Sequence, residues 1–376
     1  MRTARPVPVL IMARELDQGG VERDVAKIAT GLDRSRFEPH VGAFCPYGMR
    51  YEDLRAAGVP ILPLPLTSLL SRGAISAAAR MRRYIREHGI KIVHSYDASG
   101  VFGLPTALLC GVPVRIGSQL SYRDLLDART QKLLRLSDRF ADAVLVNCEA
   151  MRRYMVNDEH IAADRVEICY NGVETTRFFP NPAPRPEPVA GASLVIGTVC
   201  ALRPEKNLTV LQEAFARVLP REGAMKLVFV GSGRELAGLQ GNAVRLKIEH
   251  ASVFVPATPA VAQWLNAIDI FVLPSYSEAF SNSLLEAMAC GCAVIGSRVG
   301  GTPELTGENG ERGLLFRSGD SDELAARILR LAENADLRTD LGRRAARFAK
   351  ESLSIEIAAC RTAEIYEKWL ERKRVK

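Results

Sequence analysis

The sequence predicts an α/β protein made of two doubly wound domains that face each other across a deep cleft. Three observations lead to this prediction: short β-rich runs alternate with helical patterns, the alternation stops at one proline-rich stretch, and it then resumes. Such alternation is typical of a parallel sheet with helices on both faces. With 376 residues, of which 47% are hydrophobic and 25% charged, the chain is long enough for two hydrophobic cores.

The first series of elements precedes residue 178. We expect a strand, a helix and five further strands at Val7–Met12, Val21–Leu32, Pro39–Phe44, Lys91–Ser95, Val112–Gly117, Ala143–Asn147 and Val166–Tyr170. The stretch that follows, FFPNPAPRPEPVAG at residues 178–191, is too rich in proline for either a helix or a strand. The sequence therefore predicts a first domain at residues 1–177 and a linker at 178–191.

A second series of elements follows the linker. Its strands and helices are expected at Leu194–Val199, Leu208–Val218, Lys226–Val230, Ser252–Val255, Ile270–Leu273, Ser283–Ala289 and Ala293–Ser297. This series predicts a second domain at residues 192–354. Ligands of such sheets bind beyond the carboxyl ends of the strands, so two facing domains line a cleft. The last helix, about Ile355–Leu370, is long and amphipathic, and we expect residues 355–376 to pack back on the first domain.

Cysteine usage and hydropathy indicate a cytoplasmic protein. The eight cysteines are scattered without a CxxC pair, which is typical of reduced thiols. Cys290 and Cys292 have no histidine near them in the sequence, which favours small core residues over a metal site. No apolar run approaches the roughly 18 residues that a membrane-spanning helix needs.

The net charge of +7 predicts an anionic partner. Four arginines, Arg80, Arg82, Arg83 and Arg86, lie among apolar residues in a basic helix predicted within residues 72–91. This helix has two interpretations: it binds an anionic membrane surface peripherally at the inner face of the membrane, or it is a solvated surface helix. Nucleic-acid binding is not predicted, because the chain has no zinc-finger spacing and few aromatic residues beside its basic runs.

The segment SYSEAFSNSLLEAMACGCAVIGSRVGGTPEL has the strongest chemical signal. Ser281, Asn282 and Ser283 are N-cap residue types, and the first N–H groups of the helix that follows can hold an anion. Glu278 and Glu286 flank this point, and carboxylates accept hydrogen bonds from hydroxyls. The sequence therefore predicts a site for a phosphorylated, hydroxyl-rich ligand. In the alternative interpretation, Glu286 closes a capping box with Ser283 and Glu278 is a solvated acid.

Three further loops follow predicted strands. Gly19 and Gly20 precede a helix and let backbone approach a ligand closely, although a structural turn explains them as well. Arg203 and Lys206 open a helix and are natural partners of a diphosphate, with surface solvation as the alternative. Gly231 begins one more close-approach loop after the strand KLVFV.

Six motifs, in their order along the chain, resemble those of the retaining glycosyltransferases of family 4. They are GGVER, YNGVETTRF, LRPEKN, VGSGRE, EAFSNSLLEAMACG and GGTPEL. The resemblance covers essentially the whole chain and implies the GT-B fold of two Rossmann-like domains. The first domain would bind the acceptor and the second the nucleotide sugar. The implied enzyme moves a hexosyl group from a nucleoside diphosphate sugar to a glycan or lipid-linked acceptor, in polysaccharide, lipopolysaccharide or glycolipid biosynthesis.

The resemblance also implies roles for the residues of the EAFSNSLLE motif. Glu286 would hold the ribose hydroxyls of the donor, and Glu278 the hydroxyls of the transferred sugar. The backbone N–H groups of Phe280, Ser281 and Asn282 would bind the diphosphate and the sugar.

Positive charge would take the place of a metal ion. By the resemblance, Arg203 and Lys206 neutralise the leaving diphosphate, so neither a metal nor another cofactor is expected. The only DxD, Asp320-Ser321-Asp322, lies where a helix is predicted to start, and we interpret it as a helix cap.

The chain departs from the family pattern at two positions. Ala201 stands where many relatives have Arg, and Gln119 lies in a loop where many have His. His94 is on a different strand and is interpreted as a hydrogen-bonded core residue. These departures keep two rivals open: a non-catalytic nucleotide-binding or membrane-associated subunit of the same fold, and a sugar-nucleotide epimerase.

Overall fold

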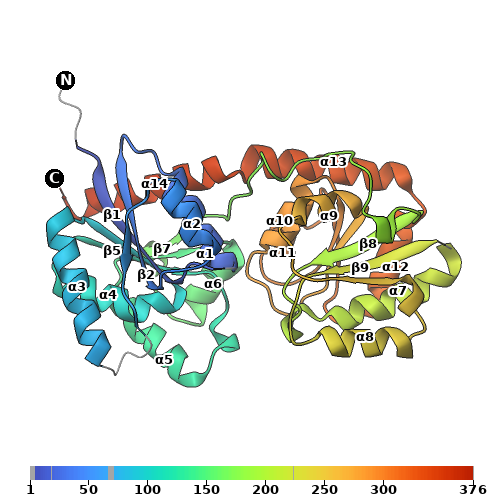
Figure 1. Cartoon of the computed structure of the whole chain (residues 1–376), viewed down its shortest axis with the longest axis horizontal. Helices are drawn as coiled ribbons and strands as arrows, with labels where there is room; N and C mark the ends of the chain where they lie inside the picture. Colours follow the sequence, from blue (N-terminus) through green and yellow to red (C-terminus); the bar gives the residue numbers. More distant parts are fainter. Residues whose placement is uncertain (1–4, 18, 67–71, 223, 376) are drawn as a thin grey trace. The chain divides into compact units, whose positions relative to one another are not determined.

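The chain folds into two compact units. The computed structural model describes residues 5–17, 19–66, 72–222 and 224–375. The first unit contains the described residues up to Gly172 together with those from Ile355 onward, and the second contains those of Val173–Ser354. Each unit is a parallel sheet with helices packed against it (Figure 1). The prediction of two doubly wound, Rossmann-like domains is therefore confirmed.

The first unit has a seven-stranded sheet in the order β3-β2-β1-β4-β5-β6-β7. Its strands are β1 (Val7–Glu15), β2 (Phe37–Cys45), β3 (Ile61–Pro63), β4 (Ile92–Tyr96), β5 (Val114–Gln119), β6 (Ala143–Val146) and β7 (Val166–Ile168). Its helices are α1 (Gly20–Gly31), α2 (Met49–Ala56), α3 (Arg72–His88), α4 (Gly100–Leu109), α5 (Ala128–Ser137), α6 (Glu149–Asn157) and α14 (Ile355–Arg372). Because strand order reverses between β1 and β4, the carboxyl ends of these two strands form a topological switch point.

Strand β1 is buried on both faces. Val9 and Ile11 belong to a core cluster with residues of α1 and α14, whereas Leu10 and Met12 belong to a cluster with residues of α3 and α4. Successive side chains of a strand point to opposite faces of the sheet. Helices α1 and α14 therefore cover one face, and α3 and α4 the other.

Histidine 94 on β4 lies in the core of the first unit. Its Nδ1 is 2.7 Å from the hydroxyl of Tyr366 on α14, and its Nε2 is 2.7 Å from the hydroxyl of Ser118 on β5. Burial lowers the pKa of His94 to about 3, so the ring is neutral at physiological pH. The interpretation of His94 as a hydrogen-bonded core residue is confirmed.

The second unit has a six-stranded sheet in the order β10-β9-β8-β11-β12-β13. Its strands are β8 (Leu194–Val199), β9 (Met225–Val230), β10 (Ser252–Val255), β11 (Ile270–Leu273), β12 (Ala293–Ser297) and β13 (Leu314–Phe316). Its helices are α7 (Leu208–Glu222), α8 (Leu236–Arg245), α9 (Val261–Ala267), α10 (Asn282–Ala289), α11 (Thr302–Thr306), α12 (Ser321–Ala332) and α13 (Ala335–Ser352). The strand order reverses between β8 and β11, which places the switch point of this unit at their carboxyl ends.

The proline-rich residues 178–191 are part of the second unit. Arg185 donates to both carboxylate oxygens of Asp269, at 2.8 and 2.7 Å, and residues Glu187–Val189 form a short 3₁₀-helix. The chain passes between the units after Gly172 and again after Ser354. The contacts thus assign residues 173–177, which were expected in the first domain, to the second unit.

Candidate active site

Two loops meet at the switch point of the second unit. The loop after β8 contains Arg203, Glu205 and Lys206, and the loop after β11 contains Tyr276 and Glu278. The backbone N–H of Tyr276 donates to the carbonyl of Glu205 at 3.0 Å. This bond joins the loops, so residues far apart in the sequence come together where a doubly wound sheet binds its ligands.

Lys206 and Glu278 form an ion pair across these loops. Lys206 Nζ donates to Glu278 Oε2 at 2.6 Å, and the two side chains are only 16% and 14% exposed. Burial alone would lower the pKa of Lys206, but the Glu278 carboxylate outweighs burial and the net pKa is raised. Lys206 therefore carries a permanent positive charge in a largely desolvated position, where charge acts strongly.

Serine side chains hold the Glu278 loop in place. Ser275 Oγ donates to Glu278 Oε2 at 3.2 Å, and Ser297 Oγ, from the neighbouring strand β12, donates to the carbonyl of Ser275 at 2.6 Å. Because both serines are fully buried, the loop is fixed to the sheet. The Glu278 carboxylate is thus positioned before any ligand arrives.

Helix α10 starts beside this loop. Ser281 is its N-cap, and its hydroxyl accepts from the N–H of Leu284 at 3.3 Å. Glu286 is four residues after Asn282, so the two lie on the same face of the helix, and Glu286 is 3% exposed. A capping box would need the acid at the third helical residue, which is Leu284. The alternative in which Glu286 caps the helix with Ser283 is therefore wrong.

Glycines allow the backbone around the switch point to pack closely. A Cβ on Gly300, whose φ is +51°, would lie 1.6 Å from the carbonyl oxygen of Glu278. A Cβ on Gly231, whose φ is +146°, would lie 1.9 Å from the carbonyl oxygen of Cys200. Both positions require glycine, because a carbonyl oxygen cannot move aside as a flexible side chain can. Gly231 is thus needed for packing of the β8 and β9 loops, whatever its role toward a ligand.

Arg203 lies outside the Lys206–Glu278 pair. Its side chain is 66% exposed, and its ion pair with Glu205 spans 3.9 Å. The exposed guanidinium is attached to the same short loop as Lys206. The structure therefore brings Lys206, Glu278, Ser281 and Glu286 to one edge of the sheet and leaves Arg203 at its surface.

The predicted glycine pair lies in the first unit. Gly19 is the N-cap of α1, with extended backbone, and Gly20 is the first helical residue. A Cβ on Gly19 would lie 1.8 Å from Oε2 of Glu22, so the carboxylate of Glu22 lies over the start of the helix. Burial raises the pKa of Glu22. In this conformation a protein carboxylate occupies the helix N-terminus where an anionic ligand would otherwise bind.

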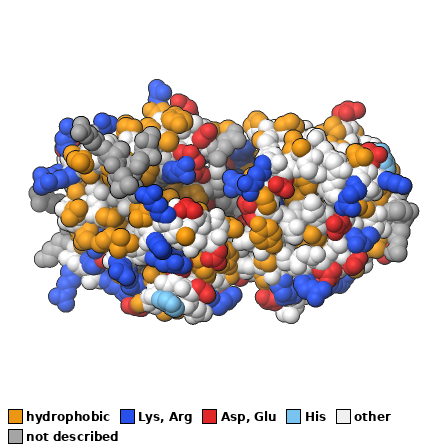
Figure 2. Space-filling model, turned by 90° about the horizontal axis from the view of Figure 1, so that it is seen from below, with side chains coloured by type: hydrophobic (Ala, Val, Ile, Leu, Met, Phe, Trp, Pro, Cys, Tyr) orange, Lys and Arg blue, Asp and Glu red, His pale blue; other side chains and the backbone are white. Residues whose placement is uncertain are grey.

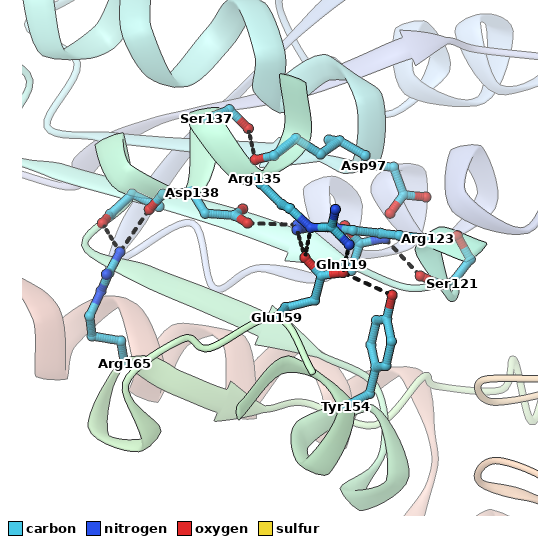
Figure 3. Close-up of polar contacts among 12 residues, drawn as sticks. Asp97, Gln119, Ser121, Arg123, Arg135, Ser137, Asp138, Tyr154, Glu159 and Arg165 are labelled. Carbon is cyan, nitrogen blue, oxygen red and sulfur yellow. Dashed lines mark hydrogen bonds and ion pairs between the residues drawn. The ribbon is translucent and has the colours of Figure 1, made fainter. Parts of the chain in front are cut away.

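Gln119 and Arg123 form a buried contact in the first unit that sequence patterns did not indicate (Figure 3). Arg123 Nε donates to Gln119 Oε1 at 3.0 Å, and Gln119 Nε2 donates to the carbonyl of Ser121 at 2.7 Å. Both ends of the Gln119 amide are thus engaged, which fixes its orientation. The segment after β5 is thus organised around the contact of Arg123 with Gln119.

The guanidinium of Arg123, 1% exposed, lies between two carboxylates (Figure 3). It is 2.8 Å from Asp138 Oδ2 and 2.8 Å from Glu159 Oε2. Glu159 also accepts from Arg135 and from the hydroxyl of Tyr154, at 2.9 and 3.0 Å. Although burial opposes ionisation of Glu159, these donors together lower its pKa.

Asp97 is a second residue that sequence patterns did not indicate. It follows β4 at the switch point of the first unit and has a φ of +44°, which is uncommon for a residue with a side chain. Its Oδ1 accepts from the N–H of Leu120 at 3.1 Å, and burial raises its pKa to about 6. Inspection of each strand end, rather than of motifs, would have singled out this carboxyl.

The Asp320-Ser321-Asp322 segment caps a helix. Asp320 Oδ1 accepts from the N–H of Glu323 at 2.9 Å at the start of α12, and Asp322 pairs with Arg217 at 2.7 Å. The interpretation of this DxD as a cap is confirmed. Within the described residues, no cluster of three or more His, Cys, Asp or Glu side chains is arranged to hold a metal ion. No described helix is long and apolar enough to cross a membrane.

Comparison with known families accounts for most of the chain. The family described as Glycosyltransferase Family 4 matches residues 18–177, and the family described as Glycosyl transferases group 1 matches residues 193–334. N-acetyl-alpha-D-glucosaminyl L-malate synthase of Bacillus anthracis is 25% identical over 78% of this chain and 78% of its own length. D-inositol 3-phosphate glycosyltransferase of Acidothermus cellulolyticus is 28% identical over 90% of this chain and 79% of its own length.

Solved structures share the fold. Anabaena HepE in complex with UDP and glucose matches with a TM-score of 0.84 at 21% identity, over 96% of this chain and 100% of that chain. WaaG, a glycosyltransferase involved in lipopolysaccharide biosynthesis, matches with a TM-score of 0.74 at 16% identity, over 95% of this chain and 99% of that chain. Two Rossmann-like units on one chain define the GT-B class of protein. Within that class, the chain belongs to the group 1 glycosyltransferases.

Proposed function

We propose that this glycosyltransferase moves a sugar from a nucleoside diphosphate sugar to an acceptor hydroxyl, with retention at the anomeric carbon and without a metal ion. The observation that carries the proposal is the Lys206–Glu278 pair beside the capped start of α10. Departure of the nucleoside diphosphate leaves negative charge. A fixed ammonium and a helix N-terminus stabilise such charge without the reorganisation that water would need.

Each carboxylate has a separate task in this proposal. Glu286, on α10, accepts hydrogen bonds from the ribose hydroxyls of the donor. Glu278, held by Ser275 and Lys206, accepts from hydroxyls of the transferred sugar. An ammonium has three donors, so Lys206 can contact Glu278 and a diphosphate oxygen together. In this proposal the backbone N–H groups of Phe280, Ser281 and Asn282, around the start of α10, bind the diphosphate and the sugar, as the family resemblance implies.

The configuration at the anomeric carbon is retained because the acceptor hydroxyl attacks the same face of the sugar from which the leaving group departs. The acceptor hydroxyl approaches beside the leaving phosphate, whose oxygen takes the hydroxyl proton as the new glycosidic bond forms. This route needs no histidine, which fits the presence of Gln119 at the end of β5. The acceptor is a glycan or a lipid-linked sugar in polysaccharide, lipopolysaccharide or glycolipid biosynthesis, and the fold shared with WaaG supports this class.

Replacing Glu286 with Ala should weaken donor binding about 10- to 100-fold. A hydrogen bond to a charged group contributes roughly 1.5–3 kcal/mol to the binding free energy. Removal of the Glu286 carboxylate takes this hydrogen bond away from the ribose hydroxyls. Isothermal titration with UDP, GDP, ADP and their sugar conjugates measures the loss, starting with UDP because HepE binds it. Glu213→Ala, on α7, is the matched control and should bind as the unaltered protein does. Equal affinities of the Glu286 and Glu213 variants would show that the ribose lies elsewhere.

Helix α3 is the proposed membrane-binding element. Its exposed basic side chains are Arg80, Arg82, Arg83 and Arg86. Exposed apolar side chains lie near it in the same unit, with Ile75 on α3 and Leu109 at the end of α4, 75% and 86% exposed. Figure 2 shows basic and hydrophobic side chains next to one another on the first unit. Anionic lipid attracts each such arginine by about 1 kcal/mol near the surface.

Changing the four α3 arginines to Gln should weaken binding to vesicles containing phosphatidylglycerol by at least about tenfold. Sedimentation with such vesicles, and with vesicles of phosphatidylcholine alone, measures the effect. The control changes the exposed basic residues of α13, Arg343, Arg344, Arg347 and Lys350, to Gln. Equal binding of both variants would mean that the attraction depends on net charge only and not on α3.

A further inference from the structure

An exposed aromatic side chain stands at the switch point of the second unit. Tyr276 lies three residues after the end of β11 and is 52% exposed. Within the described residues, no group forms a hydrogen bond with its hydroxyl and no aromatic ring packs on its own. Single aromatic residues are exposed on many proteins, so exposure alone does not indicate a site. Tyr276 is distinguished by how its backbone is held and by what lies beside it.

The backbone on both sides of the Tyr276 side chain is fixed to other segments. The carbonyl of Ser275 accepts from Ser297 Oγ, on β12, at 2.6 Å and from Ser318 Oγ, in the loop after β13, at 3.2 Å. The N–H of Tyr276 donates to the carbonyl of Glu205, in the loop after β8, at 3.0 Å. A tyrosine has only two side-chain torsions, so a ring on a fixed backbone loses little entropy when a ligand covers it.

Tyr276 is close enough to Glu278 to contact the same ligand. Two residues of chain span at most about 7 Å, which is within reach of an aromatic side chain. The residue that accepts the N–H of Tyr276 is Glu205, and the next residue, Lys206, pairs with Glu278 at 2.6 Å. The phenol ring therefore flanks the ion pair, and a sugar that bonds to the Glu278 carboxylate lies within its reach.

We propose that the ring of Tyr276 packs against the apolar face of the transferred sugar, a hexopyranose, while Glu278 binds hydroxyls at the edge of the same sugar. This inference rests on the proposed function. The face of an aromatic ring is negative, and the C–H groups on one face of a hexopyranose carry a small positive partial charge, so the two surfaces attract. Sites for small molecules commonly combine an aromatic surface with a few placed polar groups. Tyr276 then contributes to recognition of the sugar and not of the nucleotide.

Isothermal titration with paired ligands tests this contact. The pairs are UDP with UDP-glucose, UDP-galactose and UDP-N-acetylglucosamine, GDP with GDP-mannose, and ADP with ADP-glucose. Tyr276→Ala should weaken binding of the sugar conjugate at least about fivefold, because the packing of the ring on the sugar is lost. The affinity for the nucleotide alone should stay within about twofold, since the nucleotide does not touch the ring.

Two further variants show whether the ring face is responsible. Tyr276→Phe keeps the ring without its hydroxyl and should recover conjugate binding to within about twofold. Phe179→Ala is the control: Phe179 is 44% exposed in the same unit, and its backbone lies beside Cys290, which follows the last residue of α10. It should leave both affinities unchanged.

Three results with a protein that binds a nucleotide would overturn the contact. They are an equal loss of nucleotide and conjugate binding in Tyr276→Ala, a loss in Tyr276→Phe as large as that in Tyr276→Ala, and no selective loss in either variant. If the unaltered protein bound none of the nucleotides, the proposed transferase function would be contradicted and this inference with it. The failure of the contact alone and the failure of the proposed function thus give different results.

Discussion

Replacing Lys206 with Met should reduce the turnover number about 10²- to 10³-fold while the protein stays folded. The ammonium is the largely buried cation that faces the proposed diphosphate site, and loss of one preorganised donor to a developing anion costs roughly 2.7–4 kcal/mol of transition-state stabilisation. Met keeps the apolar length of the side chain and removes the charge. Steady-state kinetics with varied donor should show a larger change in kcat than in KM, because the charge being stabilised develops during departure of the leaving group.

Two further variants separate the chemical role of Lys206 from a structural one. Lys226→Met removes a lysine of the same unit that donates to the carbonyl of His250 at 2.8 Å, and it should leave kcat within about twofold. Lys206→Arg restores a cation and should recover part of the activity, although its planar fork does not reproduce a point charge. If Lys206→Met raised KM alone, the lysine would bind donor and transition state equally, and the assigned role would be wrong.

Glu278→Gln provides the second arm of a double-mutant cycle with Lys206→Met. The two side chains are in contact at 2.6 Å, so their effects should not add. In the single Lys206 variant the Glu278 carboxylate stays largely desolvated without its cation, which costs free energy. The double variant has no carboxylate at position 278 and therefore avoids this cost. The difference between the double variant and the sum of the single variants measures how much of the loss belongs to the pair.

The sequence was sufficient to predict the local structure around the candidate site of the second unit, because that structure depends on local rules. An apolar run followed by a Ser-rich turn and a helical pattern predicts a strand, a loop and a capped helix, and Ser281 does cap α10. The rule does not specify which serine caps, and the capping box with Ser283 was wrong for that reason. The contact between Lys206 and Glu278 joins loops far apart in the sequence, and only the parallel arrangement of β8 beside β11 brings them together.

Other features depend on long-range contacts that leave no local pattern. The proline-rich segment has the composition of a linker, yet Arg185 attaches it to Asp269 of the second unit. No strand was expected at β3, which ends at Pro63; β3 is an edge strand, where a missing N–H donor is tolerated. Arg123 lies in a polar loop that suggests a solvated cation, and only folding encloses it between two carboxylates.

Replacing Arg123 with Met should lower the free energy of unfolding of the first unit by about 3–5 kcal/mol. Removal of one partner of a buried ion pair is strongly destabilising, and here it takes the cation away from Asp138 and leaves Glu159 with Arg135 and the Tyr154 hydroxyl. Loss of the Nε bond also releases Gln119, so the loop after β5 should lose its fixed conformation. Arg135→Met is the matched control: its side chain is 49% exposed although it contacts the same Glu159, and it should cost about 1 kcal/mol or less.

The two tryptophans allow this loss to be assigned to one unit. Trp369, on α14, is packed in the core of the first unit, and Trp264, on α9, is buried in the second. In a Trp264→Phe background, urea unfolding followed by fluorescence reports the first unit, and in a Trp369→Phe background it reports the second. Arg123→Met should shift the midpoint only where Trp369 is the reporter. An equal shift with both reporters would mean that the units unfold as one, and no shift would mean that the carboxylates around Arg123 become protonated or hydrated at little cost.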